Sequence, residues 1–137
     1  GQRGILVRAW EGLDAGLPVP DDVLLIDEAP HDWLFPQMAA VVHHGGAGTL
    51  AGALRAGVPS VAVTHTFDQP MWGWRVHELG AGAPPISRRK LTAEKLADAI
   101  TAALAPAVRE RAGAIGDRVR GEDGVATAVA IIEASLR

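Results

Sequence analysis

The chain has 137 residues, 48% of them hydrophobic, and a formal net charge of −3, which fits one domain with a sizeable core. The absence of cysteine excludes disulfides and cysteine-zinc sites, and 13 Lys+Arg without a basic run argue against nucleic-acid binding. Because the sequence shows no stretch of about 18 apolar residues and no signal-peptide pattern, we expect a cytoplasmic chain without a transmembrane segment.

Short apolar runs alternate with helical stretches over the first 86 residues. Strands are expected at 4–8, 23–26, 40–43, 60–63 and 83–86, and a turn-rich segment at 11–22. Helices are expected at 33–38 with Asp32 as cap, at 47–56 with Gly57 at the C-terminal end, and at 70–79 with Gly80 closing. This alternation favours an α/β fold, a Rossmann-like doubly wound parallel sheet with helices on both faces.

Beyond residue 90 the sequence predicts a helical C-terminal tail. Thr92 is a candidate N-cap for a helix whose apolar residues continue to Leu104 at helical spacing. A second helix starts at Pro106 and a third at Glu122 or Asp123. Their apolar stripes are Val108, Ala112, Ile115 and Val119 in the second, and Val125, Val129, Ile132 and Leu136 in the third.

A glycine-rich segment, residues 43–49, lies where an expected strand ends and a helix begins. In a parallel sheet this edge binds ligands, and the free N–H groups at a helix N-terminus attract anions. Gly45, Gly46 and Gly48 allow close backbone approach, and Thr49 adds a hydroxyl. The residues alone leave two readings open, a phosphate site and an ordinary tight turn, since neither common nucleotide fingerprint is present.

The two adjacent histidines of this segment, His43 and His44, raise the question of a metal site. Adjacent residues on a strand point to opposite faces, and no carboxylate stands at ligand spacing, so we expect no metal here. Instead, one of His43 and His44 should face the loop while the other packs or caps.

Asp68, Gln69 and Pro70 occupy the next strand-to-helix junction. The Asp68 carboxylate accepts hydrogen bonds and the Gln69 amide both donates and accepts them, so the pair suits the hydroxyls of a sugar. The residues alone nevertheless favour helix capping by Asp68. Trp72 and Trp74 follow two positions apart, so one should be in the core and the other exposed, whereas Trp10 and Trp33 stay ambiguous.

Taken together, these segments resemble the UDP-glycosyltransferase superfamily, and more closely its bacterial antibiotic-modifying and sterol-glucosyltransferase-like branch. The matching segments are Val42–Thr49, Arg55–Pro59, Asp68–Pro70 and Trp72–Gly73, with Pro30–Pro36 upstream. The resemblance implies the GT-B fold, in which two Rossmann-like domains face a cleft. It identifies residues 1–137 as the nucleotide-sugar (donor) binding C-terminal domain, N-terminally truncated. The acceptor-binding domain and its general base would be missing, so the isolated chain should be inactive.

The resemblance also assigns roles to individual residues. His44 corresponds to the histidine that contacts the donor phosphates and stabilises the leaving group. Gly45, Gly46, Gly48 and Thr49 match the remaining phosphate-binding positions, and Asp68 and Gln69 match the pair that holds the transferred sugar. Ala29, Pro30 and His31 lie where the base- and ribose-contacting loop runs.

Two departures leave the nucleotide open between UDP and dTDP. Glu28 stands near the place of a uracil-stacking Trp, and Gly52 replaces a ribose-binding Glu. The implied reaction is inverting transfer from a UDP- or dTDP-sugar to a hydroxyl of a small lipophilic acceptor, without metal or cofactor. The alternatives are a non-catalytic nucleotide-diphosphate-sugar binding module and a sugar-nucleotide epimerase of the same fold.

Overall fold

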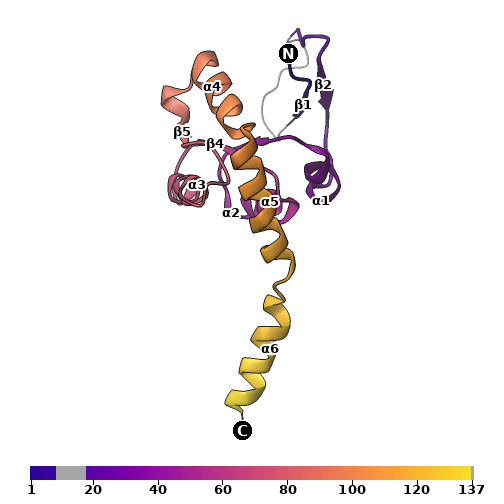
Figure 1. The fold of residues 1–137 in the computed structure, drawn as a ribbon, viewed down its shortest axis with the longest axis vertical. Helices are drawn as coiled ribbons and strands as arrows, with labels where there is room; N and C mark the ends of the chain where they lie inside the picture. Colours follow the sequence, from indigo (N-terminus) through magenta and orange to yellow (C-terminus); the bar gives the residue numbers. More distant parts are fainter. Residues whose placement is uncertain (9–17, 137) are drawn as a thin grey trace.

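The computed structural model describes residues 1–8 and 18–136. Trp10 and most of the expected turn-rich segment lie outside the described residues. From Val23 to Ser87 strands and helices alternate, and helices complete the chain (Figure 1). The elements are β1 Gly4–Val7, β2 Val23–Ile26, α1 His31–Leu34, η1 Phe35–Gln37, β3 Val41–His43, α2 Ala47–Ala56, β4 Ser60–Thr64, α3 Gln69–Glu78, β5 Ile86–Ser87, η2 Arg88–Lys90, α4 Ala93–Ala103, α5 Pro106–Arg120 and α6 Gly124–Ser135.

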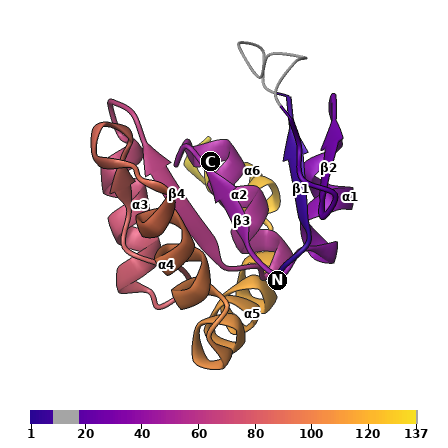
Figure 2. The same cartoon turned by 90° about the horizontal axis from the view of Figure 1, so that it is seen from above.

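All strand pairs in the described residues are parallel, as expected for an α/β domain. β1 pairs with β2, and a second sheet has the order β3-β4-β5. The described strands therefore make two parallel sheets instead of one continuous ladder. Figure 2 shows the sheets beside each other, with β1 and β3 as the neighbouring edges.

Helices cover both faces of the larger sheet. Val41 pairs with Ser60, so Val41 and the next residue of β4, Val61, point to opposite faces. Val41 packs in a core cluster with Ala53 of α2, while Val61 packs in another with Ala99 of α4. The doubly wound arrangement predicted from the sequence is confirmed.

Two expected elements differ from prediction. The helix expected at 33–38 is α1 followed by a 3₁₀ turn, because Pro36 has no N–H for an α-helical hydrogen bond. Asp32 does not cap it: Pro30 is the N-cap, and the Asp32 carboxylate accepts a hydrogen bond from the N–H of Trp33. The strand expected at 83–86 is reduced to Ile86–Ser87, since Pro84 and Pro85 donate no ladder hydrogen bonds.

Other local predictions are confirmed. α2 spans the expected residues and ends at Gly57, whose φ is 71°. The Thr92 hydroxyl caps α4 by accepting from the N–H of Lys95. Trp72 packs against the core while Trp74 is half exposed.

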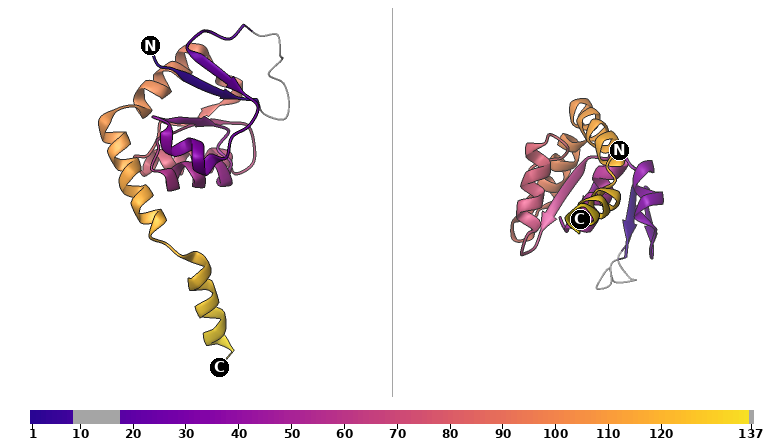
Figure 3. Two further views of the ribbon diagram at one scale, coloured as in Figure 1. Left: turned by 90° about the vertical axis from the view of Figure 1, so that its right-hand side faces the viewer. Right: turned by 90° about the horizontal axis from the view of Figure 1, so that it is seen from below.

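The last helix is unlike the others. The predicted apolar stripe of α6 is solvent-exposed, with Val125 77% and Leu136 81% exposed, because α6 extends away from the body of the domain (Figures 1 and 3). Among the described helices, none combines the length and apolar character needed to span a membrane.

Candidate functional site

The loop between β3 and α2 is a glycine turn that leads directly into a helix N-terminus. Gly45 adopts a left-handed φ of 89°, which favours glycine, and Gly46 is the N-cap of the ten-residue α2. Because Gly46 has no side chain, it leaves the first N–H groups of α2 uncapped by that residue. Gly48 and Thr49 lie in the first turn. Here the positive end of the helix dipole and several backbone donors face the carboxyl edge of the sheet.

The two histidines separate as predicted. His44 is exposed and lies over Gly46, where an added Cβ would overlap its imidazole. His43 is half-buried, and its Nδ1 accepts a hydrogen bond from the N–H of Gly45 at 3.0 Å. Burial, followed by the charges of His44 and His31, lowers the pKa of His43 to about 4. His43 is therefore a neutral acceptor at neutral pH. In residues 1–8 and 18–136 no three metal-ligating side chains gather.

Asp68 does not cap α3, so the interpretation that the residues alone favoured is wrong. Its backbone is helical, with φ −81° and ψ −11°, whereas a capping side chain needs an extended residue. The carboxylate instead accepts from the indole N–H of Trp72 at 2.8 Å. The Gln69 side-chain oxygen accepts from the N–H groups of His65 and Thr66, at 2.8 and 3.3 Å, and so holds the loop after β4.

The two motifs meet at one edge of the sheet. A Cβ added to Gly45 would lie 3.2 Å from the carbonyl oxygen of Gln69 and 3.4 Å from its Cβ. The glycine-rich loop after β3 therefore lies directly against the first residue of α3. The phosphate and sugar positions predicted from the resemblance are neighbours in space, although His44 and Asp68 stand 24 positions apart in the sequence.

Beside this loop lies a cavity of about 770 Å³ between α1 and α2. It brings His31 together with Gly48, and His31 stacks on Phe35 with ring centroids 4.4 Å apart. Ala29 packs against the core, and Pro30 starts α1. The lining residues are His31, Asp32, Pro36, Gly48, Gly52, Arg55, Ala56 and Arg120, so His44, Asp68 and Gln69 lie outside it.

Sequence reasoning missed Arg55 and Arg120 in this cavity. One face of α2 carries Gly48, Gly52 and Arg55, which stand four and three residues apart. This helical spacing could have indicated Arg55 as a residue of the same site. Arg120 comes from α5 and donates a hydrogen bond to the carbonyl oxygen of Arg55. No local signal places it there, because the contact joins residues 65 positions apart.

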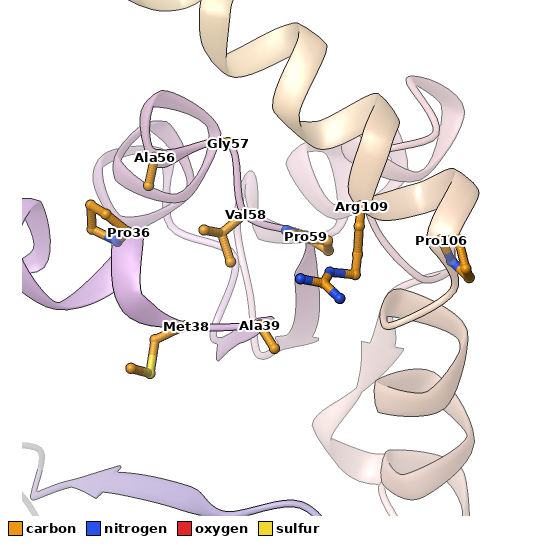
Figure 4. Close-up of a pocket in the computed structure, with 9 residues that line it drawn as sticks. All are labelled: Pro36, Met38, Ala39, Ala56, Gly57, Val58, Pro59, Pro106 and Arg109. Carbon is orange, nitrogen blue, oxygen red and sulfur yellow. The ribbon is translucent and has the colours of Figure 1, made fainter.

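A second cavity of about 460 Å³ lies at the opposite, amino-terminal edge of the sheet (Figure 4). Met38 and Ala39 precede β3, and Val58 and Pro59 precede β4, while Arg109 reaches towards it from α5. In parallel α/β sheets ligands bind at the carboxyl edge, so this cavity is not the candidate site.

Comparison with known proteins gives the family. The chain belongs to the family described as "Erythromycin biosynthesis protein CIII-like, C-terminal domain", whose model matches residues 7–131. Its fold is that of the C-terminal domain of GT-B glycosyltransferases.

Two curated relatives and one solved structure illustrate the match. The chain is 46% identical over 129 residues to the sterol 3-beta-glucosyltransferase UGT80B1 of Arabidopsis thaliana, covering 93% of this chain and 21% of the relative. It is 43% identical over 133 residues to the O-mycaminosyltylonolide 6-deoxyallosyltransferase of Streptomyces fradiae, covering 96% and 30%. The crystal structure of the glycosyltransferase VinC in complex with dTDP matches with a TM-score of 0.69 at 34% identity, covering 75% of this chain and 26% of that one. The chain thus spans about a fifth to a third of these glycosyltransferases and corresponds to their C-terminal domain.

Proposed function

We propose that this chain is the donor-binding half of an inverting glycosyltransferase that takes a UDP- or dTDP-sugar. The observation that carries the proposal is the contact of Gly45 with Gln69. It brings the glycine-rich loop, proposed to bind phosphate, next to Asp68 and Gln69, proposed to bind the sugar, at one edge of the sheet. Relatives named as glycosyltransferases, one of them solved with dTDP, support it.

The proposed chemistry of this half is stabilisation of the leaving group. The acceptor oxygen attacks the anomeric carbon, the bond from that carbon to the diphosphate oxygen breaks, and the acceptor proton passes to a base outside this chain. Negative charge then grows on the diphosphate. We propose that the backbone N–H groups at the start of α2, the Thr49 hydroxyl and the His44 ring stabilise this charge, so the proposal requires no metal or cofactor.

The acceptor is proposed as a small lipophilic alcohol, a sterol or a natural product, since the relatives' names describe such molecules. It would bind to a domain outside residues 1–137, so the isolated chain should bind the donor without transferring its sugar. The nucleoside is proposed to enter the cavity beside His31 and Gly52. A Cβ added at Gly52 would lie in van der Waals contact with the Phe35 ring, at 3.4 Å, so glycine leaves that space in the cavity to a ligand.

The two separate sheets support a proposal about domain boundaries. Ile5, Leu6 and Val7 of β1 are each 38–39% exposed and Val42 of β3 is 46% exposed, although parallel sheets are normally buried. We propose that a strand from outside this chain lies between β1 and β3 in the whole protein. In a longer chain that begins upstream, the amide of Val42 should exchange with solvent much more slowly than in residues 1–137. Equal exchange of that amide in the two would contradict the proposal.

Replacing His44 with alanine tests the phosphate site. We expect binding of UDP or dTDP to weaken about 10- to 100-fold, because a hydrogen bond to a charged group contributes about 1.5–3 kcal/mol. Isothermal titration calorimetry of the wild type and the variant measures this. His65→Ala is a matched control, since His65 is also exposed but follows β4. Equal affinity of the His44 and His65 variants would refute the role of His44.

Replacing Asp68 with alanine tests the sugar site against a purely structural role. Trp72→Phe is the matched control, because it removes the same 2.8 Å hydrogen bond and keeps the carboxylate. If Asp68 holds sugar hydroxyls, Asp68→Ala should reduce affinity for the nucleotide sugar about tenfold while sparing the bare diphosphate, and Trp72→Phe should change neither. An equal loss of sugar selectivity in both variants would show that Asp68 acts through Trp72.

A further inference from the structure

The imidazole of His43 makes a short-range contact that the proposed chemistry does not use. Its Nδ1 accepts from the N–H of Gly45, two residues further along, at 3.0 Å. At Gly45 the chain then turns, with a φ of 89°. An acceptor at Nδ1 places the ring proton of the neutral imidazole on Nε2.

This hydrogen bond holds the turn at Gly45 from one side. On the other side, Gly45 lies against Gln69 and Thr64, and a Cβ added to it would lie 3.5 Å from Thr64 Cγ2. Gly45 is itself buried and directly precedes Gly46, the N-cap of α2. The position of Gly45 therefore decides where His44 and the free N–H groups of α2 point.

The imidazole is not explained by packing alone. Its Nε2 is buried and has no hydrogen-bond partner among residues 1–8 and 18–136, which is an energetic cost. An apolar side chain would fill the same space without that cost. Within the described residues, what the ring supplies is the acceptor at Nδ1.

We infer that His43 is a positioning residue, which holds the Gly45 turn so that the backbone donors at the start of α2 and the His44 ring meet the diphosphate of the donor. The inference rests on the proposed function. It assigns the two adjacent histidines different tasks: His44 contacts the phosphates, and His43 acts through the backbone of Gly45.

Two substitutions at His43 test whether the hydrogen-bond acceptor at Nδ1 matters or only the shape of the ring. His43→Asn places an amide oxygen close to the position of Nδ1, where it can accept from the N–H two residues on. His43→Gln places its polar atoms near the position of Nε2 and has no acceptor beside Gly45. We expect His43→Gln to weaken binding of UDP or dTDP about 2- to 10-fold, and His43→Asn to bind within about twofold of the wild type.

Calorimetric titration of the 137-residue chain with UDP and dTDP gives these affinities, and hydrogen exchange of the Gly45 amide, followed by NMR without ligand, reports the hydrogen bond itself. That amide should exchange faster in His43→Gln and be protected in His43→Asn. Unchanged diphosphate affinity in His43→Gln, or an equal loss in both variants, would overturn the positioning role alone. If the wild type binds neither diphosphate, the proposed function fails, and the diphosphate role of His43 fails with it.

Discussion

Replacing Gly116 with alanine should lower the free energy of unfolding by about 3 kcal/mol, because α5 crosses the end of α2 at this residue with no room for a methyl group. The added Cβ would lie 2.6 Å from the Cα of Gly57 and 2.9 Å from its nitrogen. Gly57 is the left-handed residue that ends α2, so its backbone cannot yield without disturbing that helix end. Overpacking usually costs about 1–3 kcal/mol, and a clash between backbones belongs at the upper end.

Gly113 supplies the matched control within the same helix. A Cβ added there meets nothing within 4 Å, so Gly113→Ala should raise stability by about 0.5–1 kcal/mol through helix propensity alone. Urea denaturation followed by circular dichroism measures both variants. If Gly116→Ala proved as stable as Gly113→Ala, the close crossing of α2 and α5 would be wrong.

Acid should destabilise the chain over a window set by His43. Burial, followed by the charges of His44 and His31, lowers the pKa of His43 from its ordinary value of 6.5 to about 4 in the folded chain. Between these values the unfolded chain binds the extra proton and the folded chain does not. The contribution of His43 is therefore complete above pH 6.5 and is lost as the pH falls towards 4. The two pKa values correspond to a loss of up to about 3 kcal/mol.

The measurement is the free energy of unfolding of the wild type and of His43→Gln at several pH values between 7 and 4. Glutamine does not titrate, so subtracting its curve removes the contributions of the other histidines. The difference between the curves should fall across this window as the pH is lowered. Parallel curves would mean that His43 titrates normally in the folded chain.

Gly57, Gly116 and His43 show why some features can be predicted from the sequence and others cannot. A glycine after a run of helix formers indicates a left-handed helix end, so Gly57 is predictable. Nothing in the residues around Gly116 shows that it touches Gly57, because the contact forms only when α5 packs on α2. For His43, strand alternation predicts that it and His44 face opposite ways, but not which nitrogen accepts from Gly45.

The sequence by itself determined the alternation of elements, the positions of α2 and α5, the N-cap Thr92 and the glycine-rich loop at a strand end. These depend on local spacing, on proline and glycine, and on side chains that reach two to four residues along the chain. The resemblance of its motifs also indicated the family, which the match to residues 7–131 confirms.

Only the tertiary structure decided the rest. Asp68 bonds to Trp72 instead of capping, because the backbone at Asp68 is helical. Arg120 reaches Arg55 across 65 residues. The contact of Gly45 with Gln69 arises because β3 and β4 are parallel neighbours, which brings the loops at their carboxyl ends together. Likewise, the apolar stripe of α6 has the period of a buried helix, yet it is exposed, since periodicity defines an apolar face and only three-dimensional packing supplies what covers it.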